Sequence, residues 1–215
     1  MAEESSLRER LIDIGEHLVL TEGSASSGLR EIARRAGVSH GAPRRHFPTH
    51  RTLLAAIARR GFEDLRARFE AAVAGGTTPR DRLAALTRVY LGYALERRAM
   101  FELMFRHDLL DSTRLRDSTL PLFERIVELV AHCRAERNTA RPGPPPTVTA
   151  AALWSNLHGI AQLRAWGSLQ LSAGPPASDG HCPDGSRLDR LVAAVLDAHL
   201  GPVGPSHPSP ERPQP

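Results

Sequence analysis

Residues Leu29–Arg51 read LREIARRAGVSHGAPRRHFPTHR, and this stretch decides how the rest of the chain is interpreted. Its apolar residues recur at i, i+3, i+4 and i+7, which predicts one buried face of a short amphipathic helix. The residues on that face are Leu29, Ile32, Ala33 and Ala36. Charged residues occupy the remaining positions, so the other faces of this helix are expected to meet solvent.

A glycine and a serine follow this first helix, and they predict a tight turn into a second one. Gly37 tolerates the left-handed backbone that closes a helix, and Ser39 can cap the next helix with its hydroxyl. We expect that helix to cover 40–47, with Pro43 tolerated in its first turn and Pro48 ending it. The arrangement is helix, turn, helix, with Val38 and Phe47 turned into a core.

Positive charge is concentrated in the same region. Between positions 30 and 60 there are eight arginines and one acid, a charge of +7, whereas the whole chain carries +4 and the remainder therefore sums to about −3. Concentrated charge of this kind is typical of phosphate binding through counterion release. His40, Arg44, Arg45 and His46 are the expected outward donors to phosphates or purine edges. The alternative is a solvated surface in a protein that uses arginine throughout.

The run from Leu11 to Leu54 resembles the N-terminal domain of the tetracycline-repressor (TetR) family of transcriptional regulators. The matching segments are LIDIGEHLVLTEG, LREIARRAGVS, HGAPRRHF and PTHRTLL, in family order and spacing. The resemblance implies a three-helix DNA-binding bundle. Its DNA-contacting positions would be Ser27, Arg30, Ser39, His40, Ala42, Arg44, Arg45, His46, His50 and Arg51.

The chain departs from the family pattern inside the recognition helix. The family often has a lysine at the place of His40, a threonine at Ala42, a leucine at Pro43 and an aromatic residue at Arg44. The usual threonine and tyrosine phosphate contacts are therefore absent, and we expect Arg44 to serve as a more strongly charged phosphate donor.

Length and composition limit the other possibilities. The 215 residues suffice for a small DNA-binding domain and one larger domain. The sequence contains no run of 18 apolar residues, so no membrane span is predicted. The segment MAEESSLRER lacks the apolar core of a signal peptide, and we therefore expect a cytoplasmic protein. Cys133 and Cys182 have no metal-binding spacing and are expected to be free thiols, with a redox switch as the alternative.

Helical periodicity continues beyond Pro48, and no useful alternating strand pattern is present, so the predicted class is all-α. The expected organisation is a DNA-binding domain over 1–50, a connecting helix over 51–75, a helical effector-binding and dimerisation domain over 76–201, and a disordered proline-rich tail over 202–215. The further helices are expected at 52–74, 80–97, 100–107, 120–137, 148–171 and 187–200.

The segment Trp154–Gly159, WSNLHG, resembles a tryptophan-histidine-glycine signature in the C-terminal domains of some TetR-like regulators. A glycine inside a helix costs about 1 kcal/mol relative to alanine, which predicts that a helix or ligand approaches closely at Gly159. The predicted effector pocket has apolar walls with a few polar groups. Its residues are Tyr90, Tyr93, Phe101, Met104, Phe105, Phe123, Trp154 and His158. The alternative is ordinary core packing around a hydrogen-bonded histidine.

Two helices are expected to form a dimer interface. The helix over 148–171 is apolar almost all round, so it needs contacts on several sides. The final helix has one clean apolar stripe, and the resemblance implies that this pair forms a four-helix interface with its two-fold mate. The predicted interface residues are Leu163, Trp166, Leu188, Leu191, Val192, Val195 and Leu196.

The sequence contains no catalytic motif that we recognise, and it predicts no enzyme, no cofactor and no metal site. The expected protein is a homodimeric repressor that binds a palindromic operator in double-stranded DNA and is released by an unidentified small molecule. Two alternatives remain open. One is a basic structural protein that compacts DNA without ligand control, and the other is a ligand-binding helical protein with degenerate DNA binding.

Overall fold

The computed structural model describes residues 2–23, 28–106, 112–137, 143–169 and 184–202. These residues form helices joined by turns, with no strand among them, which confirms the all-α class. The described helices are α1 (Ala2–Glu22), α2 (Leu29–Arg35), α3 (Pro43–His46), α4 (His50–Ala74), α5 (Pro79–Glu96), α6 (Arg98–Met104), α7 (Ser112–Arg137), α8 (Pro146–Ala165) and α10 (Asp184–Leu200). None of these helices combines the length and the apolar character needed to span a membrane.

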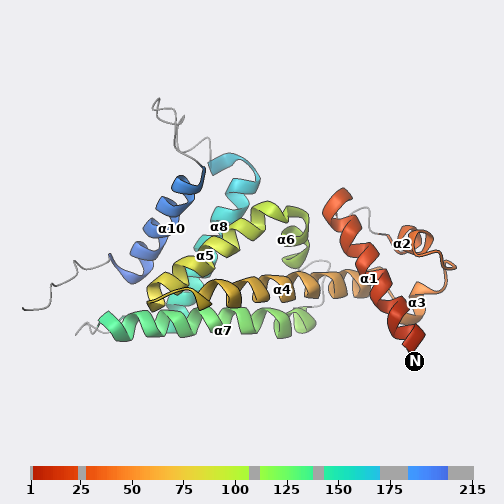
Figure 1. The fold of residues 1–215 in the computed structure, drawn as a ribbon, viewed down its shortest axis with the longest axis horizontal. Helices are drawn as coiled ribbons and strands as arrows, with labels where there is room; N and C mark the ends of the chain where they lie inside the picture. The colour runs from red at the N-terminus through yellow and green to blue at the C-terminus, as the bar shows by residue number, and fades with distance from the viewer. Residues whose placement is uncertain (1, 24–27, 107–111, 138–142, 170–183, 203–215) are drawn as a thin grey trace, which may run out of the picture.

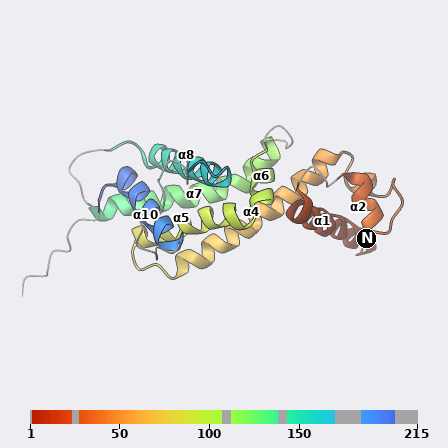
Figure 2. The same cartoon turned by 90° about the horizontal axis from the view of Figure 1, so that it is seen from above.

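The long helix α4 connects the two ends of the molecule. At its N-terminal end α4 packs on α1, which in turn packs on α2 and α3. Along the rest of its length α4 packs on α5, α6 and α7, and α8 and α10 pack on α5 and α7 (Figure 1). The view from above shows the same division, with α10 at the end farthest from α1–α3 (Figure 2). A shift of α4 would therefore move helices at both ends of the molecule.

The turn after α2 has the geometry that the sequence predicts. Gly37 adopts φ +66°, in the left-handed region that favours glycine. Its N–H donates to the carbonyl of Arg34, and the N–H of Val38 donates to the carbonyl of Ala33. These two bonds form a Schellman motif, which satisfies the last carbonyls of α2 and turns the chain sharply toward α3.

Helix α3 is shorter than the predicted 40–47 helix. The residues before it form a turn in which the Ala42 N–H donates to the Ser39 carbonyl, and the Arg44 N–H donates to the Gly41 carbonyl. Pro43 has no N–H to donate, so the hydrogen-bond ladder cannot begin ahead of it. The expected Ser39 hydroxyl cap is wrong, because Ala42 is the N-cap residue and no side chain caps this helix.

Three further bounds differ from the sequence expectation. Helix α7 begins at Ser112 and continues through Pro121, where the prediction started only at 120. Helix α6 begins at Arg98 and ends at Met104, ahead of the predicted 107, which lies outside the described residues. Helix α8 ends at Ala165 because Gly167 takes φ +73° and closes it, while the predicted end at 171 also lies outside the described residues.

Ion pairs join α1 to α4 and to the start of α6. The Arg60 guanidinium pairs with Glu9 at 2.6 Å and also with Asp13, both on α1. Arg97, between α5 and α6, lies 3.4 Å from Glu16 of α1 and 3.4 Å from Asp64 of α4. The group is a network rather than one exposed pair, so it holds α1 against α4 more firmly than a single surface bridge would.

Candidate nucleic-acid interface and ligand pocket

The surface formed by α2, the turn at Gly37 and α3 carries the predicted DNA-contacting residues. Those that the structure exposes are Arg30, Ser39, His40, Arg44, Arg45 and Arg51, while Ala42, His46 and His50 are half-buried. Among the described residues, no carboxylate pairs with Arg30, Arg44 or Arg45. Ser27 lies outside the described residues. Arg44 and Arg45 are therefore the exposed arginines of α3.

Part of the positive charge counted in the sequence is neutralised within the fold. Arg34 donates two hydrogen bonds to Glu31, at 2.9 and 2.6 Å, and Arg35 donates to Glu31 at 2.7 Å and to Glu22 at 2.6 Å. Hydrogen bonds from Arg34 and then Arg35 lower the pKa of Glu31 to about 2. Arg60 pairs with α1 and Arg59 lies 3.7 Å from Glu63, so at least four of the eight arginines are engaged in ion pairs. The charge that can face a partner is smaller than +7.

A groove of about 700 Å³ lies between α6, α7 and α8, and it contains part of the predicted pocket. Phe105, Phe123, Trp154 and His158 line it. The full lining is Phe105, Arg116, Thr119, Leu120, Phe123, Trp154, Ser155, His158 and Gly159. Three of these, Arg116, Thr119 and Leu120, come from α7 at or ahead of the predicted start of that helix, which is why the sequence reading missed them.

The imidazole of His158 is packed against the aromatic side chains of α6. Its ring centroid lies 4.6 Å from that of Phe105 and 5.5 Å from that of Phe101. The Tyr90 hydroxyl lies 3.0 Å from Nδ1 of His158, and the Gln162 amide lies 3.4 Å from its Nε2. His158 therefore joins α5, α6 and α8 while one side of it faces the groove.

Burial keeps the tyrosine of this pair in its neutral form. Tyr90 is 2% exposed, and burial raises the pKa of its hydroxyl. The hydroxyl therefore stays protonated at neutral pH, and it can donate to Nδ1 of His158 or accept from it, according to the histidine tautomer. A bound molecule meets an imidazole held in place among aromatic walls.

Four predicted pocket residues do not line the groove: Tyr90 and Phe101 contact His158, while Tyr93 and Met104 lie at Gly61. The Tyr93 hydroxyl donates to the Gly61 carbonyl at 3.1 Å, and the sulfur of Met104 packs onto the same glycine. A Cβ at Gly61 would lie 2.7 Å from the Met104 sulfur and 2.9 Å from Met100 Cγ. Gly61 thus allows α6 to contact α4 closely, a role that its place in the apolar stripe of α4 did not predict.

At Gly159 the predicted close approach of another helix is absent. A Cβ there would meet no atom of the described chain within 4 Å, and the residue is exposed at the edge of the groove. The space beside Gly159 is therefore open to a molecule in the groove or to a partner that packs on α8.

The predicted dimer residues divide into two groups. Val192, Val195 and Leu196 of α10 are 1%, 6% and 2% exposed, because this stripe packs within the chain on α5, α7 and α8. They cannot supply contact area to a second copy in this conformation. Leu188 and Leu191 are half-buried. On α8, Leu163 is 40% exposed, and Trp166 at the end of the helix is 66% exposed.

Comparisons with known proteins agree with this architecture. Residues 83–179 match the family model described as tetracyclin repressor-like, C-terminal domain. No curated protein sequence matches the chain. A solved protein of unknown function from Rhodococcus sp. RHA1 is 30% identical, with 90% of this chain and 93% of that one covered and a TM-score of 0.71.

Two further solved structures are similar in fold. A regulatory protein of the tetR family from Rhodococcus RHA1 is 18% identical, with 92% of this chain and 98% of that one covered and a TM-score of 0.65. RolR, solved in complex with resorcinol, is 18% identical, with 92% of this chain and 89% of that one covered and a TM-score of 0.63. Residues 83–179 of the chain thus match a tetracyclin repressor-like C-terminal domain, and the fold of nearly the whole chain is shared with a solved regulatory protein of the tetR family.

Proposed function

We propose that this chain is a repressor that binds a palindromic operator in double-stranded DNA as a homodimer. The observation that carries the proposal is the Gly37 turn, which directs α3 so that Arg44 and Arg45 are exposed. Arginine side chains in this position donate to phosphates and to guanine edges. A symmetric dimer would place two such helices about 34–36 Å apart, or at a multiple of that spacing, to match two half-sites.

A second copy is expected to pack on the α8 and α10 side of the chain. At the C-terminal end of α8 the large exposed apolar side chains are Leu163 and Trp166, and α10 exposes the small residues Ala193 and Ala194. Because the main stripe of α10 is already buried, the proposed interface uses its outer face. Trp166→Ala should shift the chain from dimer to monomer in sedimentation velocity. Leu20→Ala, at an exposed apolar position of α1 outside the proposed interface, is the control and should leave the dimer intact.

The proposed effector is a small aromatic or amphipathic molecule in the groove between α6, α7 and α8. Phe105, Phe123 and Trp154 supply apolar contact, and His158 supplies an oriented imidazole. The structure of RolR with resorcinol supports an aromatic effector by analogy of fold. Since Phe105 directly follows α6, and α6 packs on α4 at Gly61, a molecule that displaces Phe105 has a contact route to α4.

Release would then be a shift in population. The effector binds better to a conformation in which α4 holds the two recognition helices at the wrong separation, so its binding lowers the operator affinity. By linkage, operator DNA must lower the effector affinity by the same factor. This proposal concerns binding, and it assigns no catalytic step to any residue.

The decisive experiment is selection of bound fragments from the source genome with purified full-length protein, followed by sequencing. Recovery of a discrete inverted repeat is the expected result. Uniform recovery would instead favour a protein that compacts DNA without sequence preference, and recovery of no fragment would favour a ligand-binding protein with degenerate DNA binding. A thermal-shift screen of aromatic compounds then tests the groove.

A further inference from the structure

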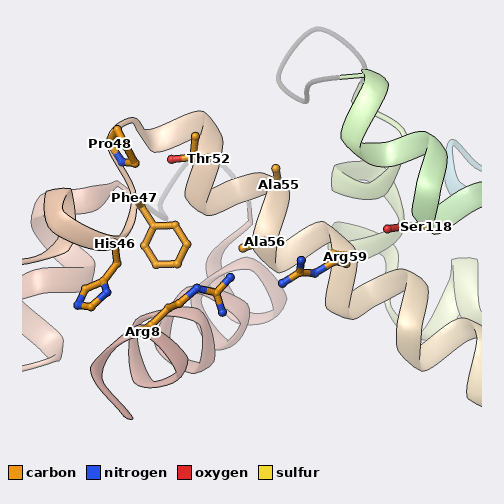
Figure 3. A pocket seen from close by; sticks show the side chains of 9 residues that line it. All are labelled: Arg8, His46, Phe47, Pro48, Thr52, Ala55, Ala56, Arg59 and Ser118. Carbon is orange, nitrogen blue, oxygen red and sulfur yellow. The ribbon is translucent and has the colours of Figure 1, made fainter. Parts of the chain in front are cut away.

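A second, smaller cavity lies where α1, α3 and α4 approach α7. Its volume is about 240 Å³. It is lined by Arg8, His46, Phe47, Pro48, Thr52, Ala55, Ala56, Arg59 and Ser118. It shares no lining residue with the groove at His158. Figure 3 shows that its walls come from the DNA-binding end of the molecule, with Ser118 as the contribution of α7.

Two guanidinium groups converge in this cavity without a carboxylate between them. Arg8 extends from α1 and Arg59 from α4, and the two groups point toward each other beside the Phe47 ring (Figure 3). None of the nine lining residues is acidic, and His46 adds a further nitrogen-bearing ring. Two like charges directed into one space repel each other, and an anion placed between them would be attracted by both.

Two acids lie near these arginines, and neither of them lines the cavity. Glu9 pairs with Arg8 at 2.6 Å but also with Arg60 at 2.6 Å. Glu63 lies 3.7 Å from Arg59, a long contact between two half-exposed side chains. The Arg8 guanidinium is further held 5.5 Å from the centroid of the Phe47 ring, which fixes its position at the wall. Arg59 therefore keeps donors available for a ligand inside the cavity.

We propose that this cavity binds a small anion of the phosphate or carboxylate class. Arg8 and Arg59 would hold the anion by charge-assisted hydrogen bonds, which suit the planar fork of a guanidinium. A water molecule occupies about 30 Å³ in the liquid, so the cavity has room for a phosphate group with several waters or for a small phosphorylated or carboxylated metabolite. Ser118 adds a hydroxyl from the opposite side.

An anion at this position would connect the DNA-binding end to α7. It would contact α1 and α4 through the two arginines and α7 through Ser118, so its binding would favour one placement of α7 against α1–α4. Binding of the anion and binding of DNA would then be linked, each altering the affinity of the other by the same factor. This linkage rests on the proposed DNA binding, whereas the anion site itself does not.

The test measures inorganic phosphate binding to the full chain without DNA, by titration calorimetry and thermal shift at constant ionic strength with chloride as the reference ion. The expected result is saturable stabilisation by phosphate. R59Q should weaken phosphate binding by about tenfold or more, the loss expected for one charge-assisted hydrogen bond. R66Q, which removes an exposed arginine elsewhere on α4, should bind phosphate as the unchanged protein does. R59Q is preferred to R8Q because Arg8 also packs on Phe47.

Phosphate binding that does not saturate, or that is equal in R59Q and R66Q, would overturn the proposal. A second arm asks whether the anion is instead a backbone phosphate of DNA. In phosphate-free buffer, R59Q should keep the operator affinity and salt dependence of the unchanged protein. Loss of both without saturable phosphate binding would assign the cavity to DNA and overturn the free-anion site. If no variant binds DNA, the proposed function fails while the phosphate titration still decides this site.

Discussion

The hydroxyl of Tyr90 on α5 lies 3.0 Å from Nδ1 of His158 on α8, and this contact joins two helices at the wall of the groove. Tyr90 also packs edge-on against Trp154 and Phe101, with ring centroids 5.9 and 5.4 Å away. The hydrogen bond therefore fixes the imidazole within an aromatic cluster contributed by three helices. The two interpretations of His158, as a pocket residue and as a hydrogen-bonded core residue, therefore both apply in part. It packs and hydrogen-bonds within the chain, and it also lines the groove.

A double-mutant cycle measures the tyrosine–histidine contact. Tyr90→Phe should lower the free energy of unfolding by about 1 kcal/mol, the usual net value of one hydrogen bond. The same Tyr90→Phe change made in a His158→Ala background should cost less, because its hydrogen-bond partner is already gone. A coupling energy of about 0.5–1.5 kcal/mol from urea denaturation is expected. Strict additivity of the two changes would show that the bond contributes nothing to stability.

Gly61 is predicted to be far less tolerant of a side chain than Gly92, although both lie within helices. Gly61→Val would force its Cβ against Met104 and Met100 and should cost about 1–3 kcal/mol through overpacking. Gly92→Val is the matched control, since the nearest atom to a Cβ there is the end of the Glu96 side chain at 3.9 Å. The control should be neutral or slightly stabilising because valine has the higher helix propensity. Urea denaturation midpoints that fall equally in both variants would contradict this account.

Much of the fold could be predicted from local signals in the sequence. The i, i+3, i+4 spacing of apolar residues located α2, and Gly37 predicted the left-handed turn that ends it. Both features depend only on neighbouring residues. Helices α4 and α5 lie within two residues of the expected bounds for the same reason. The prediction began this helix only at 120, whereas α7 starts at Ser112 and continues through Pro121.

The site was harder to predict because it depends on contacts between distant residues. The pairing of Glu31 with Arg34 and Arg35 follows from helical spacing and could have been found from the sequence. The pairing of Arg60 with Glu9 spans 51 positions and could not. Similarly, the apolar stripe of α10 shows that the helix buries one face, but it cannot say whether that face meets its own chain or a second copy.

Removal of either arginine of α3 should weaken operator binding in a way that depends on salt. Arg44→Ala and Arg45→Ala each remove an exposed charge, so the slope of log K against log salt should fall by about 0.9 for each DNA phosphate that is no longer neutralised. Arg66→Ala removes an exposed arginine on α4 and should leave the slope unchanged. Fluorescence anisotropy at several salt concentrations measures all three variants. An unchanged affinity and slope in both Arg44→Ala and Arg45→Ala would rule out α3 as the DNA-facing helix.

The acid stability of the DNA-binding end should depend on Glu31. The pKa of this carboxyl is lowered from 4.5 to about 2 by hydrogen bonds from Arg34 and Arg35, so its ionised form is favoured by folding. Its contribution is present above pH 4.5 and is lost as the pH falls toward 2. Glu31→Gln cannot be ionised, so its urea midpoint should fall less steeply over this interval than that of the unchanged protein. Glu70→Gln, an exposed glutamate of α4 outside the ion-pair cluster, should keep the original slope. If Glu31→Gln keeps that slope as well, the ion pairs of Glu31 with Arg34 and Arg35 do not stabilise the fold.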